Sequence, residues 1–245
     1  MIQPQICVII PTYNNDQTLA QVIDSALEYL SAVIVVNDGS TDDTLEILKR
    51  YQEKIEIVAY EKNRGKGFAL RCGFNRAEQL GFTHAITIDS DGQHFASDIP
   101  KFVKAAHENP NALIVGSRNL TQDNMPQKNT FANKFSNFWF TVQTAHRLSD
   151  TQSGYRLYPL QKMKRLRPLT SRYEAELEIL VRCAWRNIEI ISIPIHVFYA
   201  PEGERVTHFR PGIDFVRISL LNSLLTLLAF IYGYPSVVIR KVING

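Results

Sequence analysis

Two aspartates, Asp89 and Asp91, directly follow the short apolar run Ala85 to Ile88 and are the side chains best suited to chemistry. Residues i and i+2 of an extended chain point the same way, so the two carboxylates are expected to share one face. Neighbouring negative charges in a cleft repel each other unless a cation lies between them. Mg²⁺ or Mn²⁺ prefers such oxygen ligands, and Gln93 could add a neutral one. The pattern therefore predicts a divalent metal site that could hold a diphosphate.

Three further polar loops each follow an apolar run. Asp38, in the loop 37–43, stands where no local group is expected to need a carboxylate, so it could accept from a ribose hydroxyl or a base N–H. The loop 63–67 has two glycines that let the backbone approach a ligand, and it ends in a helix start at Lys66. It lacks the spacing of a P-loop. The earliest loop contains Pro11, Thr12, Tyr13 and Asn14. Taken alone, the loops at 11–14 and 37–43 read as a turn followed by a helix cap, and a short glycine loop with one Lys is a weak signal.

Short apolar runs alternate with helical stretches through residues 1–118. The runs are apolar throughout, which is typical of strands buried on both faces. Strands are predicted at Ile6 to Ile10, Ala32 to Val36, Ile55 to Ala59, Ala85 to Ile88 and Ala112 to Val115, and helices at about 16–29, 42–51, 67–80 and 99–108. Such alternation predicts an α/β fold with a mostly parallel sheet. Ligands bind at the carboxyl ends of parallel strands, where all four polar loops fall.

The second half changes character. We expect helices at about 131–148 and 172–185, a loop at 149–154 and a short strand at 155–158. A strand at 189–198 contains Pro194 and is therefore expected at a sheet edge. A polar loop at 200–211 precedes the last segment, Ile218 to Ile239, which has no charged residue. These features predict a catalytic domain over 1–211, divided near residue 118, and an apolar tail over 212–245.

Composition narrows the classes of protein. The formal net charge of +3 over 245 residues, without a long basic run, argues against a nucleic-acid partner. The chain has only three cysteines, and they are widely spaced in the sequence. Their number and spacing argue against a disulfide framework and against a zinc site built from cysteines. The N-terminus begins with a strand-like run rather than a basic signal segment, which predicts a cytoplasmic location.

The four loops together resemble those of family 2 glycosyltransferases of the GT-A fold, in order and in spacing. The matching stretches are residues 8–14, 36–42, 63–67 and 89–93, and the resemblance covers roughly residues 6 to 210. The chain is most similar to the dolichyl-phosphate mannose and glucose synthases. Further matches are residues 115–118, 150–155 and 173–178.

The resemblance implies roles for individual residues. Nucleotide-sugar binding would involve Pro11, Thr12, Tyr13, Asn14, Asp38, Lys66, Asp89 and Arg205, and metal binding would involve Asp89, Asp91 and Gln93. Asp91 would also be catalytic, Arg118 would face the phosphates or the acceptor, and Asp150 with Ser153 and Gly154 would line the acceptor side. The chain departs from the family at Asn15, where a Glu is frequent, and has Arg205 or Arg210 where a Lys usually binds phosphate.

The resemblance also implies an inverting transfer of one sugar, because the QxxRW motif of processive synthases is absent. A polyprenyl phosphate acceptor is already anionic and needs no general base. A hydroxyl acceptor would need one, and Asp150 or Glu176 could serve. The alternatives are a soluble transferase acting in cell-surface polysaccharide synthesis, a non-catalytic nucleotide-sugar binder and a nucleotidyltransferase, although Thr12, Tyr13 and Asn14 lack the glycine-rich signature of the last.

The uncharged segment Ile218 to Ile239 has three interpretations. Its length could span a bilayer, but Gly233 and Pro235 interrupt it. A mild polar stripe at helical spacing favours an amphipathic helix lying on a membrane surface, over a core or homodimer helix. We therefore expect peripheral contact with the cytoplasmic face of a membrane and a lipid or glycan acceptor.

Overall fold

The computed structural model describes residues 3–118, 127–164, 166, 168–198 and 211–244. Its centre is a seven-stranded sheet in the order β3-β2-β1-β4-β6-β5-β7. The strands are β1 Ile6–Thr12, β2 Val33–Asp38, β3 Glu56–Tyr60, β4 His84–Thr87, β5 Leu113–Arg118, β6 Arg156–Pro159 and β7 Ile190–Ile195. Only β6 runs antiparallel to its two neighbours, β4 and β5, so the predicted mostly parallel sheet is confirmed.

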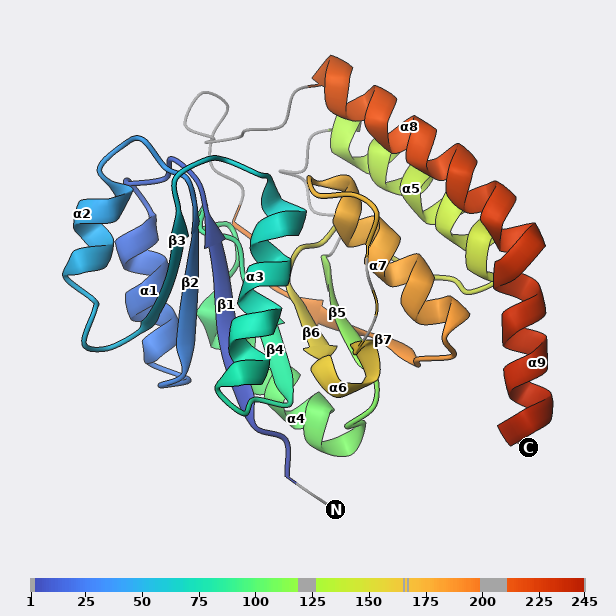
Figure 1. Ribbon diagram of the computed structural model, residues 1–245, viewed down its shortest axis with the longest axis horizontal. Helices are drawn as coiled ribbons and strands as arrows, with labels where there is room; N and C mark the ends of the chain where they lie inside the picture. Colours follow the sequence, from blue (N-terminus) through green and yellow to red (C-terminus); the bar gives the residue numbers. More distant parts are fainter. Residues whose placement is uncertain (1–2, 119–126, 165, 167, 199–210, 245) are drawn as a thin grey trace.

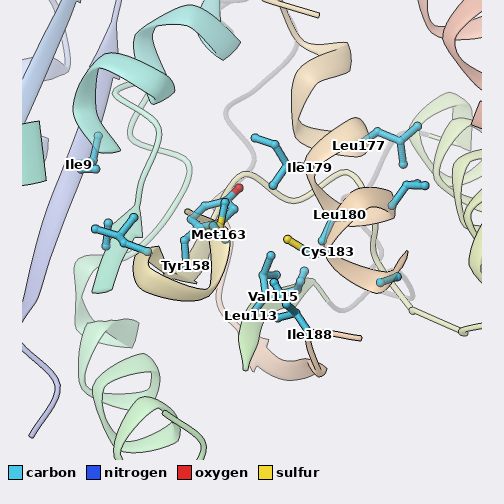
Figure 2. Packing of buried hydrophobic residues seen from close by; sticks show 14 of the residues in the cluster. Ile9, Leu113, Val115, Tyr158, Met163, Leu177, Ile179, Leu180, Cys183 and Ile188 are labelled. Atoms are coloured by element: carbon cyan, nitrogen blue, oxygen red, sulfur yellow. The ribbon is translucent and has the colours of Figure 1, made fainter. Parts of the chain in front are cut away.

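Helices cover both faces of the sheet (Figure 1). They are α1 Leu19–Leu27, α2 Thr44–Lys49, α3 Lys66–Gln79, α4 Ile99–Glu108, α5 Gln127–Thr144, α6 Leu160–Met163, α7 Glu174–Trp185, α8 Pro211–Leu228 and α9 Tyr234–Asn244, with short turns η1 Ala96–Asp98 and η2 Ala229–Gly233. Strand β1 shows how the layers form. Its residues alternate, so Val8 and Ile10 pack toward α1, α2 and α4, while Cys7 and Ile9 pack toward α3 and α7. The second of these cores joins β1, β5, β6, α6 and α7 (Figure 2).

Strand β3 corrects one expectation. The run Ile55 to Ala59 is not buried on both faces, because β3 is an edge strand and its residues are half-buried or exposed. The edge position predicted for the strand with Pro194 is confirmed by β7, which pairs only with β5. Pro194 has no backbone N–H to donate. An edge strand tolerates this, because one of its sides forms no hydrogen bonds with a neighbouring strand.

The register brings the carboxyl ends of the central strands together. Thr12 of β1 is opposite Asn37 of β2, and Asp38 is opposite Tyr60 of β3. The N–H of Ile88 donates to the carbonyl of Ile9 at 3.1 Å, which continues the β1–β4 alignment past the end of β4. The four polar loops therefore leave the sheet on the same side, at the carboxyl ends of its strands.

The C-terminal segment is helical, as predicted. Residues Asp214–Arg240 form a helix long and apolar enough to cross a membrane. One side of this segment packs on the domain: Leu225 and Ala229 are fully buried, and the Gln143 amide donates to Asn222 Oδ1 at 3.0 Å. Figure 1 shows α8 running beside α5. The π-helical turn η2 ends two residues before Pro235, whose missing N–H interrupts regular α-helical bonding.

Candidate functional site

Side-chain hydrogen bonds join three of the polar loops into one surface. Asn14, in a left-handed conformation with φ 44°, accepts from the N–H of Thr41 at 2.7 Å. Asn15 is buried, and its amide donates to Ser90 Oγ at 3.1 Å. Asn15 stands where a Glu is frequent in the family. In this chain its hydrogen bond connects the first loop to the loop of Asp89 and Asp91. Thr12 Oγ1 is buried nearby without a hydrogen-bond partner among the described residues, so a ligand hydroxyl or amide could satisfy it.

The carboxylate of Asp38 has a local role that the sequence did not predict. It accepts from Arg64 N at 2.7 Å, from Gly65 N at 2.8 Å and from the Asn63 amide at 3.0 Å. The expectation that no local group needs this carboxylate is therefore wrong. Asp38 holds the loop 63–65 in the conformation that starts α3 at Lys66, and its predicted contact with the nucleotide stays a prediction.

A lysine and two carboxylates from distant parts of the chain meet at the end of β4. Lys66 Nζ lies 2.6 Å from Asp89 Oδ1 and 2.9 Å from Glu176 Oε2. All three side chains are mostly buried, with exposed fractions of 15%, 24% and 10% for Lys66, Asp89 and Glu176. Burial works against the charge on Lys66, but Asp89 and Glu176 outweigh it and raise its pKa. The lysine is therefore a fixed positive charge beside the first aspartate.

Gly154 makes this cluster possible. A Cβ at this position would lie 2.7 Å from Asp89 Oδ2, 2.8 Å from Lys66 Nζ and 3.2 Å from Glu176 Oε1. Only a residue without a side chain allows the backbone before β6 to touch all three charged groups. The expected place of Ser153 and Gly154 beside the site is thus consistent with the geometry.

Asp91 completes the predicted pair of aspartates. Burial and the negative charge of Asp89 raise the pKa of Asp91 to about 6. Its Oδ1 accepts from the backbone N–H of Gln93 at 3.0 Å. The negative charge of Asp89 thus opposes ionisation of Asp91, and a divalent cation bound by both would relieve that repulsion.

The side chains at this site suit a divalent ion that takes only a few of its ligands from the protein. Within the described residues, no group of three or more His, Cys, Asp or Glu side chains could by itself hold a metal. Mg²⁺ sites that serve phosphate substrates often use one or two carboxylates and complete the shell with phosphate oxygens and water. Asp89 and Asp91 supply two such ligands, and Glu176 Oε1 is a buried oxygen with no hydrogen-bond partner in the described chain. The residues therefore suit a metal that arrives with a diphosphate.

Asp150 is an anchor for Arg118 across the site. The Asp150 carboxylate accepts from Arg118 Nε at 2.6 Å and Nη2 at 2.9 Å, and from the Asn133 amide at 2.6 Å. It also accepts from the backbone N–H groups of Gln152 and Ser153 at 3.1 and 3.2 Å. Burial opposes its charge, but these donors, Arg118 foremost, lower its pKa. A carboxylate with a lowered pKa and occupied lone pairs is a poor general base, so we revise its expected role from base to anchor.

Two other features of the site were not evident in the sequence. The charged run around Glu176 gives no sign that this side chain is buried, yet the structure buries it. Arg156 of β6 is fully buried and holds the loop before it, donating to the carbonyls of Ser153 at 2.7 Å and Thr151 at 2.8 Å. A lone Arg inside an otherwise apolar strand was the only available signal. Arg205 and Arg210 lie outside the described residues.

Comparison with known proteins identifies the family. The model of glycosyl transferase family 2 matches residues 7–165. The chain belongs to this family. The family 2 match spans all four polar loops and the antiparallel strand β6. The predicted GT-A architecture, with an apolar helical tail, agrees with the observed sheet and helices.

Relatives of this family 2 glycosyltransferase include proteins named for lipid phosphates. A UDP-N-acetylglucosamine–dolichyl-phosphate N-acetylglucosaminyltransferase of Methanococcus voltae is 29% identical over 81% of the chain and 88% of the relative. The human dolichyl-phosphate beta-glucosyltransferase is 28% identical over 84% of the chain and 70% of the relative. Among solved structures, glucosyl-3-phosphoglycerate synthase of Mycobacterium tuberculosis, crystallised with Mn²⁺, UDP-glucose and phosphoglyceric acid, aligns with a TM-score of 0.66. It is 18% identical and covers 92% of this chain and 79% of its own, which supports the shared fold.

Proposed function

We propose that the chain transfers one sugar from a nucleotide-diphosphate sugar to a polyprenyl phosphate, with inversion at the anomeric carbon. The observation that carries this proposal is the cluster of Asp89, Lys66 and Glu176 at the carboxyl ends of the central strands; Lys66 and Asp89 lie inside the region matched by the family, and Glu176 lies beyond it. Relatives named for dolichyl phosphate support the lipid phosphate as acceptor.

The transfer exchanges two bonds at one carbon. An acceptor phosphate oxygen attacks the anomeric carbon, the bond from that carbon to the donor diphosphate breaks, and the nucleoside diphosphate leaves. The attacking oxygen is already anionic, so no general base is needed, in keeping with the lowered pKa of Asp150. Asp150 fixes Arg118, whose guanidinium we expect to bind phosphate oxygens of the donor or acceptor.

We further propose that the reaction depends on Mg²⁺ or Mn²⁺ held by Asp89 and Asp91, with Gln93 as a third ligand. A bound divalent ion would act as a Lewis acid and neutralise charge on the leaving diphosphate. Lys66 would add a fixed positive charge on the same side. Donor binding would also use the loops with Pro11, Thr12, Tyr13, Asn14, Asp38 and Arg205.

A thermal-shift panel of UDP- and GDP-sugars, with and without Mn²⁺, tests donor binding, since a bound ligand raises the melting temperature. Asp91→Asn should lose the Mn²⁺-dependent part of the shift. A second assay measures transfer of labelled sugar to dolichyl phosphate in detergent. Stabilisation by no donor, or transfer only to hydroxyl acceptors, would refute the proposal.

The tail offers a surface for membrane contact. The side of the tail that faces away from the domain is apolar and exposed; we define this outer apolar face as Leu220, Leu224, Leu227, Phe230 and Ile231. The opposite side is fixed to α5 and α7 along its length. A spanning helix would have to carry those neighbours, with polar residues such as Lys134, into the bilayer. We therefore propose a helix lying in the plane of a membrane, at its cytoplasmic face.

Flotation with vesicles of phosphatidylcholine and phosphatidylglycerol tests this contact. Replacing Leu220, Leu227 and Phe230 together by Ser should abolish flotation without loss of fold, because these side chains are 58–66% exposed. Leu169→Ser is the matched control, since Leu169 is 67% exposed but lies outside the tail. If the parent chain does not float, or if it forms a dimer that the triple variant disrupts, the face is not a membrane surface.

A further inference from the structure

The position of Lys66 bears on how a metal could enter the site, an inference that rests on the metal dependence proposed above. The ammonium group of Lys66 forms an ion pair with Oδ1 of Asp89 at 2.6 Å. Asp89 is one of the two expected metal ligands. A lysine and a divalent ion would therefore compete for the same carboxylate. Like charges held a few ångströms apart in a partly buried site repel strongly.

Glu176 determines where that ammonium lies. Its Oε2 is 2.9 Å from Lys66 Nζ, so the ammonium contacts Glu176 as well as Asp89. Both residues stand in the first turn of their helices, α3 and α7. These two helix starts are in contact, because a Cβ on Gly67 would lie 2.3 Å from Ala175 Cβ, and Phe68 N donates to Ser171 O at 2.9 Å. The lysine is thus held by two carboxylates where the starts of α3 and α7 pack against each other.

The charges around the cluster do not balance. Asp89, Asp91 and Glu176 contribute three negative charges, whereas Lys66 and the buried Arg156, which donates to the Glu176 carbonyl at 2.7 Å, contribute two positive charges. The residual negative charge attracts a divalent ion, while the ammonium on Asp89 resists its approach. A diphosphate would ease this conflict, because its oxygens can accept both the ammonium and the metal.

We propose that Lys66, held by Glu176, keeps the affinity of the aspartate pair for a divalent ion low until a nucleotide diphosphate binds with it. Lys66 and Glu176 are positioning residues in this arrangement. Metal and nucleotide then bind cooperatively, and the coupling is reciprocal, since each increases the affinity for the other. The arrangement would make the metal enter with the donor rather than ahead of it.

Mn²⁺ binding followed by electron paramagnetic resonance tests this directly, because the signal of free Mn²⁺ falls as the ion binds. Each variant is titrated with Mn²⁺ alone and with Mn²⁺ plus saturating UDP or GDP. Lys66→Met should bind Mn²⁺ alone at least fivefold more tightly than the parent, and nucleotide should increase its Mn²⁺ affinity less. Glu176→Gln should bind Mn²⁺ alone more weakly, because it removes a negative charge and leaves the ammonium to Asp89.

The Mn²⁺ affinities of Lys66→Met and Glu176→Gln should thus change in opposite directions. If the two residues had only a structural role, both variants would bind Mn²⁺ more weakly. Lys66→Arg should restore the low affinity of the parent. Glu178→Gln is the matched control: Glu178 is a buried carboxylate on the same helix, bonded to Arg182 at 2.6 Å, and its loss should lower stability without changing Mn²⁺ affinity.

Two failures can be told apart. If the parent binds Mn²⁺ with nucleotide but Lys66→Met binds Mn²⁺ alone no more tightly, the proposed role of Lys66 is wrong while the metal-dependent function stands. If the parent binds no Mn²⁺ under either condition, the proposed metal dependence fails, and the role of Lys66 fails with it.

Discussion

Replacing Asp150 by Asn distinguishes an anchor from a general base. The substitution keeps the shape of the side chain but turns one carboxylate oxygen into an NH₂ group. Asp150 accepts from Arg118, from the Asn133 amide and from two backbone N–H groups, so an amide in either orientation faces donors it cannot satisfy. Both Asp150 and its partner Arg118 are largely enclosed, with side-chain exposures of 0% and 15%.

The expected loss of stability is large. Removing one partner of a buried ion pair costs about 3–5 kcal/mol, and the slight exposure of Arg118 favours the lower end, about 3 kcal/mol. With a urea m-value of about 2–3 kcal/mol/M, the unfolding midpoint should fall by roughly 1 M. The pKa of Asp150 is lowered in the fold, so its stabilisation is present above the ordinary carboxyl pKa and is lost as pH falls through the folded-state pKa. The difference between parent and variant should therefore shrink in acid.

Urea unfolding and steady-state kinetics over a range of pH values measure both consequences. If Asp150 anchors Arg118, the variant should have lower stability, a higher KM and a pH profile of kcat with the same shape as that of the parent. A general base predicts a loss of about 10²–10⁴ in kcat and a missing acidic limb. A variant as stable as the parent that shows this kinetic pattern would refute the reasoning. Asp98→Asn is the control, because Asp98 is a buried carboxylate that accepts from His196 N at 2.6 Å, and its loss should leave KM unchanged.

Three further substitutions test other parts of the fold and site. Burial lowers the pKa of His84, so on acidification the unfolded chain takes up this proton before the folded chain does, and stability should fall as the pH drops below the ordinary histidine value of 6.5; in His84→Gln, urea unfolding should show a weaker fall, and an equal fall would contradict this prediction. Gly154→Ala would place a methyl group 2.7 Å from Asp89 Oδ2; spreading the ion pair by about 1 Å costs roughly 2 kcal/mol at an effective dielectric constant of about 20, so the donor KM should rise by up to about thirtyfold, and an unchanged KM would count against the cluster. In Gly233→Ala, the added Cβ would lie 2.5 Å from Trp185 Nε1, and overpacking should lower the free energy of unfolding by about 1–3 kcal/mol, whereas an unaltered urea midpoint would mean that the tail does not pack there.

Much of the fold was predictable because buried parallel strands read as uninterrupted apolar runs. Strands β1, β2 and β4 begin within about one residue of their predicted starts, which is the usual uncertainty of element ends. The strand over 155–158 was also expected, but its place between β4 and β5, antiparallel to both, was not. Strand direction and partners depend on tertiary packing, and a four-residue run carries no local signal for either.

The candidate site shows a different limit. Motifs located the loops, and register explains why these meet. Sequence could not reveal which carboxylates already have their lone pairs occupied, because the donors come from elsewhere in the chain. Asp38 is bonded to residues 63–65, and Glu176 to Lys66. The run of glutamates in α7 looks like a solvated helix face, yet the structure buries all three side chains, and Glu176 pairs with Lys66 from a distant part of the chain.

The two halves predicted on either side of residue 118 cannot act as separate modules at the site. Lys66 and Asp89 come from the first half, while Gly154 and Glu176 come from the second, and the four touch one another. The cause lies in the sheet, where β6 is inserted between β4 and β5 and carries the loop of Gly154 to the end of β4. Arg118 and Asp150 join the halves again a short distance along the same edge. On the proposed assignment of the second half to the acceptor, a shift of that half would move charges that contact the first aspartate. We therefore expect binding of acceptor and binding of donor to influence each other through these contacts.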